Sequence, residues 1–87
     1  MAKILLSSMK LNKAQLAIVE EFVSLYTDLH SVNIVQLKNK EIEFYTYKEG
    51  ANRFSYDQCK RFDSKDFFVG YCKGYVDANT GNTTISN

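Results

Sequence analysis

Several features are missing from this 87-residue sequence, and each absence excludes a class of protein. No apolar run approaches the ~20 residues of a membrane-spanning helix. The apolar stretch near the start, residues 4–6, is too short for the core of a secretory signal. Lysine and arginine total 11 against 10 acids, a net charge of +1. Neither a polybasic nor a strongly acidic protein is therefore indicated.

Potential catalytic and metal-binding residues are also scarce. The only cysteines are Cys59 and Cys72, too few for the disulfide framework of a small secreted protein, so we predict two reduced thiols in the cytoplasm. The single histidine, His30, is placed at the end of the first predicted helix, where a cation interacts favourably with the helix dipole. These three residues have no recognised metal-ligand spacing, and no phosphate loop or nucleophile elbow occurs. The sequence predicts neither an enzyme nor a metal or cofactor site.

Aromatic residues are plentiful, with six Tyr and six Phe in a chain that has no Pro and no Trp. Hydrophobic residues make up 45%, which is enough to offset the conformational entropy of the chain. Aromatic rings supply core volume efficiently in a domain too small to bury much of its surface. We expect one globular domain over residues 1–78, followed by a flexible polar tail over 79–87.

The clearest local signal predicts a helix over residues 12–29. Asn12 is a good N-cap, and Gln15 lies where it completes a capping box. The apolar residues that recur at helical spacing form a wide face, which suits packing on a sheet. They are Ile18, Phe22, Leu25, Tyr26 and Leu29, joined by Val19 and Val23.

A hairpin is predicted over residues 32–48, because both of its arms are rich in strand-forming residues. Its turn contains Asn39, the residue there best able to take a positive φ angle. In the second arm Glu43 shares a face with Tyr45 and Tyr47. The charge of Glu43 marks that face as solvent-facing, so both tyrosines are expected to be partly exposed.

Two further strands are predicted on either side of these elements. Residues 3–9 alternate, with Ile4 and Leu6 on one face and Leu5 on the other. Residues 53–59 supply the last strand of the predicted sheet.

Residues 63–78 fit either a helix or a strand. As a helix they are capped by Asp63 or Ser64, and their apolar residues form one stripe. Gly70 and Gly74 weaken both interpretations, by about 1 kcal/mol each for a helix. The cap signals and the length of the apolar pattern favour the helix. The predicted fold is therefore α+β, a long amphipathic helix packed on an antiparallel sheet in the order (β)αβββα.

The strongest functional signal is an alternation of basic and aromatic residues over 45–65. Basic side chains neutralise phosphates and aromatic rings stack on bases, which is the chemistry of single-stranded nucleic-acid sites. The sequence thus predicts a binding protein that contacts RNA or a ribonucleoprotein, with an ordinary solvated surface as the competing interpretation. The predicted contact residues are Lys38, Lys40, Lys48, Arg53, Tyr56, Lys60, Arg61 and Lys65.

The predicted order from residue 12 onward, a helix, three strands and a helix, resembles that of the double-stranded RNA-binding domain, which binds largely by RNA shape. In that family a basic cluster at the start of the last helix meets phosphates, and Lys60, Arg61 and Lys65 hold a similar place here. The family's Lys-Lys-x-Ala-Lys signature is absent. The resemblance covers topology only, and it implies RNA contact through this basic cluster.

A protein inhibitor or adaptor is the alternative function. The short, proline-free, tyrosine-rich composition is similar to that of accessory proteins of large lytic phages, many of which block a host defence factor or a toxin. A homodimer is also predicted, because one small domain does not easily cover this much apolar surface. The predicted interface residues are Tyr45, Tyr47, Gly70 and Gly74.

Overall fold

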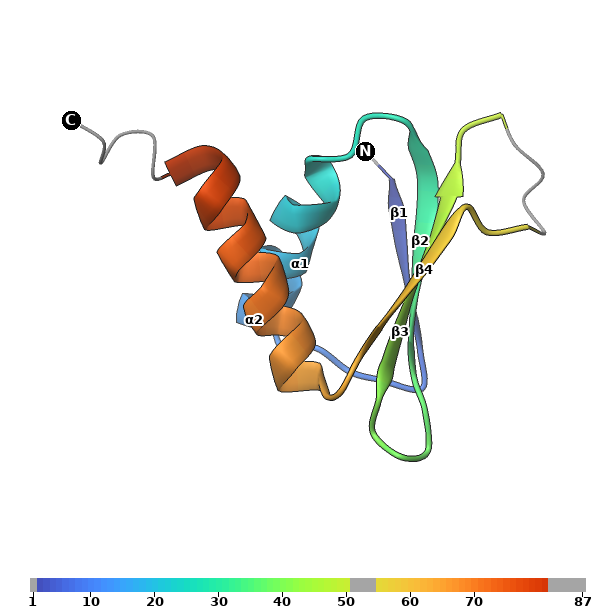
Figure 1. The fold of residues 1–87 in the computed structure, drawn as a ribbon, viewed down its shortest axis with the longest axis vertical. Coiled ribbons are helices and arrows are strands. Elements are labelled where there is room, and N and C mark those ends of the chain that lie inside the picture. Colours follow the sequence, from blue (N-terminus) through green and yellow to red (C-terminus); the bar gives the residue numbers. More distant parts are fainter. Residues whose placement is uncertain (1, 51–54, 82–87) are drawn as a thin grey trace.

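The computed structural model describes residues 2–50 and 55–81. They form two layers, a four-stranded sheet and a pair of helices that both lie on one of its faces (Figure 1). The elements follow one another as β1 (Lys3–Ser7), α1 (Lys13–Ser24), β2 (Leu29–Gln36), β3 (Ile42–Lys48), β4 (Gln58–Phe62) and α2 (Lys65–Val76). The chain is thus an α+β protein, as predicted.

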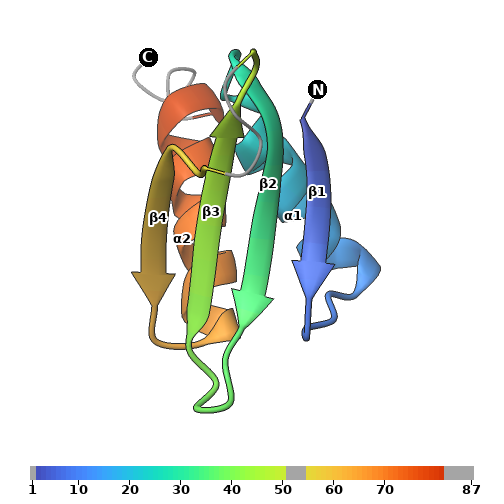
Figure 2. The same cartoon turned by 90° about the vertical axis from the view of Figure 1, so that its right-hand side faces the viewer.

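The sheet is mixed rather than antiparallel. Its strands lie side by side in the order β1-β2-β3-β4 (Figure 2). The β2–β3 and β3–β4 pairs are antiparallel, whereas β1 runs parallel to β2. The antiparallel prediction is therefore wrong for β1. The physical reason is α1, which carries the chain back along the sheet so that β2 starts at the same end as β1.

Helix α1 begins as the sequence predicts and ends early. The Asn12 side chain accepts a hydrogen bond of 2.8 Å from the Gln15 backbone, and the Gln15 side chain accepts one of 3.0 Å from the Asn12 backbone, so the capping box is confirmed. The helix ends at Ser24, because the chain must turn before Leu29 begins β2. The apolar residues at 25–29 continue the helical spacing, but they pack on the core from a turn and a strand.

The hairpin turn has a different geometry from the predicted one. Lys40, not Asn39, takes the positive φ, at 78°. The Asn39 side chain instead accepts a hydrogen bond of 3.1 Å from the Glu41 backbone N–H. This local bond is typical of asparagine in turns, and the positive φ of Lys40 completes the reversal of the chain.

The last strand lies further along the chain than predicted. β4 covers Gln58–Phe62 instead of 53–59, and Arg53 lies outside the described residues. Its pairing with β3 begins where Gln58 meets Thr46. Tyr56 therefore precedes the strand. The pairing of β4 with β3 sets this boundary. The apolar pattern of the sequence does not contain that information.

Residues 65–76 form a helix, which confirms the favoured interpretation. Ser64 is the N-cap, and its side chain accepts a hydrogen bond of 3.1 Å from the Phe67 backbone. A π-helical turn, Asp77–Gly81, continues α2. The first residues of the predicted tail therefore belong to this turn, and residues 82–87 lie outside the described residues.

The core lies between the helices and the sheet face that they cover. Phe22 of α1 is only 1% exposed, and its ring lies 5.4 Å from that of Tyr75, 5.7 Å from Phe44 and 5.9 Å from Tyr71. A second aromatic group joins the sheet to α2, with Phe68 against Phe44 and Phe62. Aromatic rings from both layers thus meet in the core, where aliphatic side chains such as Val19, Ile34 and Ile42 pack with them.

The two cysteines lie on opposite sides of the sheet. Cys72 is buried in the core on α2, and Cys59 is exposed on β4, so the two cannot pair with each other. Burial raises the pKa of the Cys72 thiol to about 12, which keeps it protonated. Within residues 2–50 and 55–81, no helix has the length and apolar character needed to cross a bilayer.

Candidate binding surface on the open face of the sheet

The face of the sheet turned away from both helices is the candidate functional surface, and we call it the open face. Figure 2 looks onto it, with the helices behind the strands. Alternation along β3 places Glu43, Tyr45 and Tyr47 here, because Ile42, Phe44 and Thr46 point into the core. No described helix or strand covers this face.

Three tyrosines form the aromatic part of the open face: Tyr45, Tyr47 and Tyr56. The rings of Tyr45 and Tyr56 meet edge to face, with centroids 5.0 Å apart. Tyr56 is 54% exposed, and Tyr45 and Tyr47 are half-buried, as the alternation of β3 predicts. Tyr56, which precedes β4, thus adds a third ring to the open face beside Tyr45.

The charged groups of the open face neutralise one another. Arg61 of β4 lies opposite Glu43 of β3, and its guanidinium donates to the Glu43 carboxylate at 2.5 Å. Glu41 lies 3.8 Å from the same guanidinium. The hydrogen bond from the Tyr45 hydroxyl and then that from Arg61 lower the pKa of Glu43. Arg61 is thus paired with carboxylates and is not available as an isolated cation.

The predicted basic cluster is divided by the fold. Lys60 and Arg61 are neighbours in a strand, so their side chains point to opposite faces of the sheet. Lys60 faces the helix layer, where its ammonium lies 3.4 Å from the Tyr71 hydroxyl and 5.7 Å from the centre of that ring. Lys65 donates a hydrogen bond of 3.2 Å to the Lys10 carbonyl. These cations are close together in the sequence, but in the folded protein Lys60 and Arg61 lie on opposite faces of the sheet.

The remaining predicted contact residues lie at the ends of strands. Lys48 sits between two carboxylates, 3.7 Å from Asp28 and 3.9 Å from Asp57. Lys38 and Lys40 are exposed in the β2–β3 turn, at the end of the sheet. These two turn lysines stand apart from the tyrosines. The predicted residues therefore do not form one continuous basic surface among the described residues.

A shallow hollow of about 260 Å³ marks the open face near β1 and β2. Ser31 and Asn33 of β2 lie between Leu5 of β1 and Tyr47 of β3. His30 lies beside it at a bulge between β2 and β3, with Nδ1 3.2 Å from the Ser31 hydroxyl, so it is not at a helix end as predicted. The hollow is lined by Leu5, His30, Ser31, Asn33 and Tyr47. Along β2, polar Ser31 and Asn33 alternate with apolar Val32 and Ile34, a pattern that indicates a solvent-facing side but not a hollow.

The four predicted interface residues do not share one surface. Tyr45 and Tyr47 lie on the open face, whereas Gly70 and Gly74 lie on α2, in the other layer. Both glycines are exposed, and apart from their chain neighbours and the backbone of their own helix no described atom lies within 4 Å of where a side chain would begin. A single two-fold contact cannot use both pairs at once.

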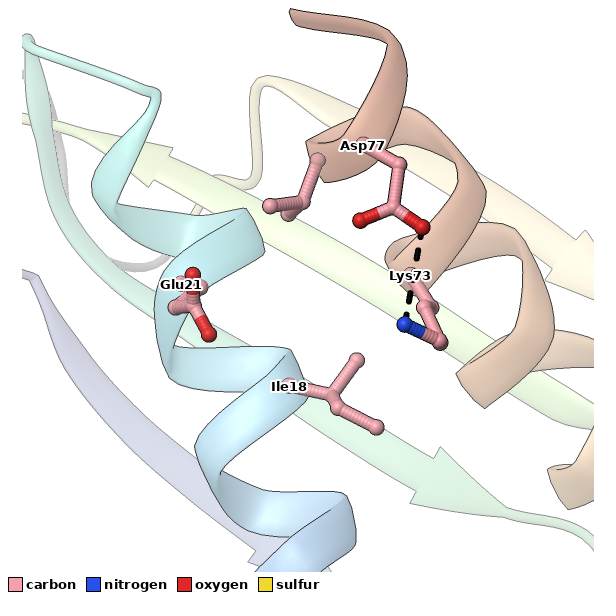
Figure 3. A pocket seen from close by; sticks show the side chains of 5 residues that line it. Ile18, Glu21, Lys73 and Asp77 are labelled. Carbon is pink, nitrogen blue, oxygen red and sulfur yellow. Dashed lines mark hydrogen bonds and ion pairs between the residues drawn. The ribbon is translucent and has the colours of Figure 1, made fainter. Parts of the chain in front are cut away.

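A second cavity lies between the two helices (Figure 3). It is lined by Ile18 and Glu21 of α1 and by Lys73, Val76 and Asp77 at the end of α2. Lys73 and Asp77 form an ion pair of 3.5 Å across one turn of the same helix. Its volume of about 60 Å³ is far below the ~300–1,000 Å³ typical of small-molecule sites, so this cavity is too small for a substrate.

Neither metal chemistry nor similarity to known proteins identifies the function. Within the described part of the chain, no three His, Cys, Asp or Glu side chains gather as metal ligands would. No family model, curated protein or solved structure matches this sequence. The geometry of the open face is therefore the basis for a functional proposal.

Proposed function

We propose that this chain is a non-enzymatic binding protein that docks on another protein through the open face, as a cytoplasmic inhibitor or adaptor does. The observation that carries the proposal is the aromatic set on that face, Tyr45, Tyr47 and Tyr56, which neither helix covers. Tyrosine supplies a large apolar contact area together with a hydroxyl that can bond to a partner. It is accordingly enriched at protein interfaces and at their energetic centres.

The charge distribution favours a protein partner over RNA. A nucleic-acid site draws its affinity from cations that neutralise phosphates. On the open face, Arg61 is bound to Glu43 and lies close to Glu41. At the end of β3, Lys48 lies between the carboxylates of Asp28 and Asp57. The core of a protein interface, in contrast, is depleted in Lys, Glu and Asp and enriched in Tyr and Arg, so it does not need unpaired cations. The tyrosines and the paired charges therefore support a protein partner.

The hollow favours a protruding side chain as the group that is bound. Its volume of about 260 Å³ is below the ~300–1,000 Å³ that is typical of small-molecule sites. Its lining combines the apolar side chain of Leu5 with the ring of Tyr47 and includes Asn33, whose Oδ1 accepts a hydrogen bond of 3.0 Å from the Ser7 hydroxyl. We therefore infer a partner surface that presents one apolar or aromatic side chain flanked by backbone polar groups.

Two variants that each remove one exposed aromatic ring test the proposal. Tyr56→Ala removes a ring from the open face, and Phe67→Ala removes an equally exposed ring from α2, where Phe67 is 59% exposed. Protein captured from nuclease-treated cell extract is purified and titrated against each variant by calorimetry. We expect wild type and Phe67→Ala to bind alike and Tyr56→Ala to bind at least tenfold more weakly, about 1.4 kcal/mol. Equal binding by all three would overturn the proposal.

RNA is the competing outcome, and a separate arm detects it. Labelled RNA is titrated at two salt concentrations against wild type and against the double variant Lys38→Glu/Lys40→Glu. These turn lysines are chosen because they are exposed, and reversing them disturbs no ion pair of the described residues. If wild type binds RNA, binding weakens steeply with salt, and the double variant loses it, the protein is an RNA-binding protein instead.

A further inference from the structure

The outer edge of β1 is unprotected. The sheet has two edge strands, β1 and β4, and no described segment pairs with the outer side of either. On β1 the large side chains are exposed on both faces, with Leu5 at 53% and Leu6 at 37%. An exposed apolar edge strand is a template for pairing with another strand, and proteins normally block it with charge, proline or a covering segment. β1 has one charged residue, Lys3, at its start.

The other edge is protected. β4 carries Lys60 on one face and Arg61 on the other, which is a common defence of an edge strand. Antiparallel pairing of β4 with a copy of itself, centred on Lys60, would place two ammonium groups directly opposite each other. Like charges in that position destabilise a sheet. The two edges therefore differ in their ability to accept a second copy.

We propose that two copies of this chain associate through β1, antiparallel and about a two-fold axis perpendicular to the sheet. Such an axis keeps the open faces on the same side, so paired residues must share a face. A register centred on Leu5 pairs all of β1. It places Leu5 opposite the partner's Leu5, Ile4 opposite the partner's Leu6, and Lys3 opposite the partner's Ser7. Every apolar residue meets an apolar residue, and no like charges meet.

The joined strands form one continuous eight-stranded sheet. The association satisfies the edge N–H and C=O groups of β1 and covers Leu5 and Leu6. A contact between two five-residue strands buries less than the ~1,600 Å² of a standard stable interface. We therefore expect a reversible dimer whose population rises with protein concentration. The tyrosines of both open faces stay uncovered in this dimer, whereas Leu5, which also lines the hollow, lies at its centre.

Cross-linking tests the register. In a Cys59→Ser background, which removes the exposed natural thiol, Leu5→Cys places two thiols opposite each other across the two-fold axis. Cβ atoms at directly opposite positions lie about 4.5–5.5 Å apart, close enough for a disulfide to form with small adjustment. Leu6→Cys is the matched control, because each copy of that residue faces the partner's Ile4. We expect a covalent dimer for Leu5→Cys and none for Leu6→Cys. Equal cross-linking, or none in either, overturns the register.

The oligomeric state tests the edge itself. Sedimentation of the wild type over about a hundredfold concentration range should show the mass rise from 10.0 kDa towards about 20 kDa. Leu5→Lys should remain monomeric at every concentration, because it places like charges at the centre of the contact. Tyr56→Lys introduces the same charge on the open face, at a residue of similar exposure, and should still dimerise. A monomeric wild type, or dimers in all three, overturns the proposal. If Tyr56→Ala still binds the protein partner, that result contradicts the proposed function and leaves the dimer proposal unaffected.

Discussion

The hydroxyl of Tyr45 donates a hydrogen bond of 2.7 Å to the carboxylate of Glu43, which lies two residues earlier on the same face of β3. Strand periodicity makes this contact possible, because residues i and i+2 project side by side. The bond ties an aromatic ring of the open face to the Glu43–Arg61 ion pair. It raises the pKa of Tyr45 well above its usual range, so the hydroxyl remains a donor at all physiological pH values.

The titration of Glu43 should depend on Tyr45. In the folded protein the pKa of Glu43 is lowered, first by the hydrogen bond from Tyr45 and then by that from Arg61. We expect Tyr45→Phe to raise the pKa of Glu43 towards the ordinary value of about 4.3, because the donor is lost. Side-chain carboxyl NMR across an acid titration measures it directly. An unchanged Glu43 pKa would show that the hydroxyl does not stabilise the carboxylate.

The same shift gives a pH dependence of stability. Because the folded pKa of Glu43 lies below its unfolded value, its stabilising contribution is present above the unfolded pKa of about 4.3 and is lost as pH falls through the folded pKa. Glu43→Gln should therefore flatten the acid side of the stability profile and leave the neutral side parallel to wild type. Urea unfolding at a series of pH values checks this. Parallel acid limbs in both proteins would contradict it.

Phe22 should carry a large share of the stability. Its ring is buried and contacts aromatic rings from α2 and β3, so Phe22→Ala leaves a cavity and should cost about 3–5 kcal/mol. That is a large part of the ~5–15 kcal/mol that stabilises an ordinary domain. Phe67→Ala, on the exposed side of α2, is the matched control and should cost less than about 1 kcal/mol. Thermal unfolding midpoints within a few degrees of each other for the two variants would place the core elsewhere.

The capping box of α1 should be worth about 1 kcal/mol. Asn12→Ala removes the acceptor for the Gln15 N–H and leaves a donor of the first turn without its partner. Asn12→Asp keeps an acceptor and places a negative charge at the helix N-terminus, so it should be neutral or stabilising. Chemical denaturation of the three proteins separates these outcomes. A harmless Asn12→Ala would mean that packing alone defines the start of the helix.

The two thiols should react at very different rates. Cys59 is exposed on β4, whereas Cys72 is buried and its pKa is raised to about 12, so little of its reactive thiolate forms. We expect a colorimetric thiol reagent to label one cysteine in the native protein and the second only in denaturant. Cys59→Ser should then show no fast labelling. Rapid labelling of both thiols would mean that α2 opens readily from the sheet.

Local signals in the sequence were sufficient for several elements. The Asn12 cap and the alternation of Glu43, Tyr45 and Tyr47 depend on residues close together in the chain, and the structure confirms both. Of the two caps predicted for the second helix, Asp63 and Ser64, the structure has Ser64. Each involves hydrogen bonds or side-chain directions over a few residues, which local chemistry specifies. The helical choice for 65–76 succeeded for the same reason.

Long-range contacts decided what these patterns could not. Local patterns were enough to predict the α+β class, the start of α1 and the partly exposed tyrosines, because short-range hydrogen bonds and periodicity carry that information. Contacts between elements ended α1 at Ser24, set β1 parallel to β2, moved the last strand to Gln58–Phe62, and placed Lys60 and Arg61 on opposite faces. Register depends on which strand pairs with which, and a shift of one residue reverses the face of every side chain. A basic cluster in the sequence thus became, in the folded protein, one cation over a tyrosine ring and another paired with two carboxylates.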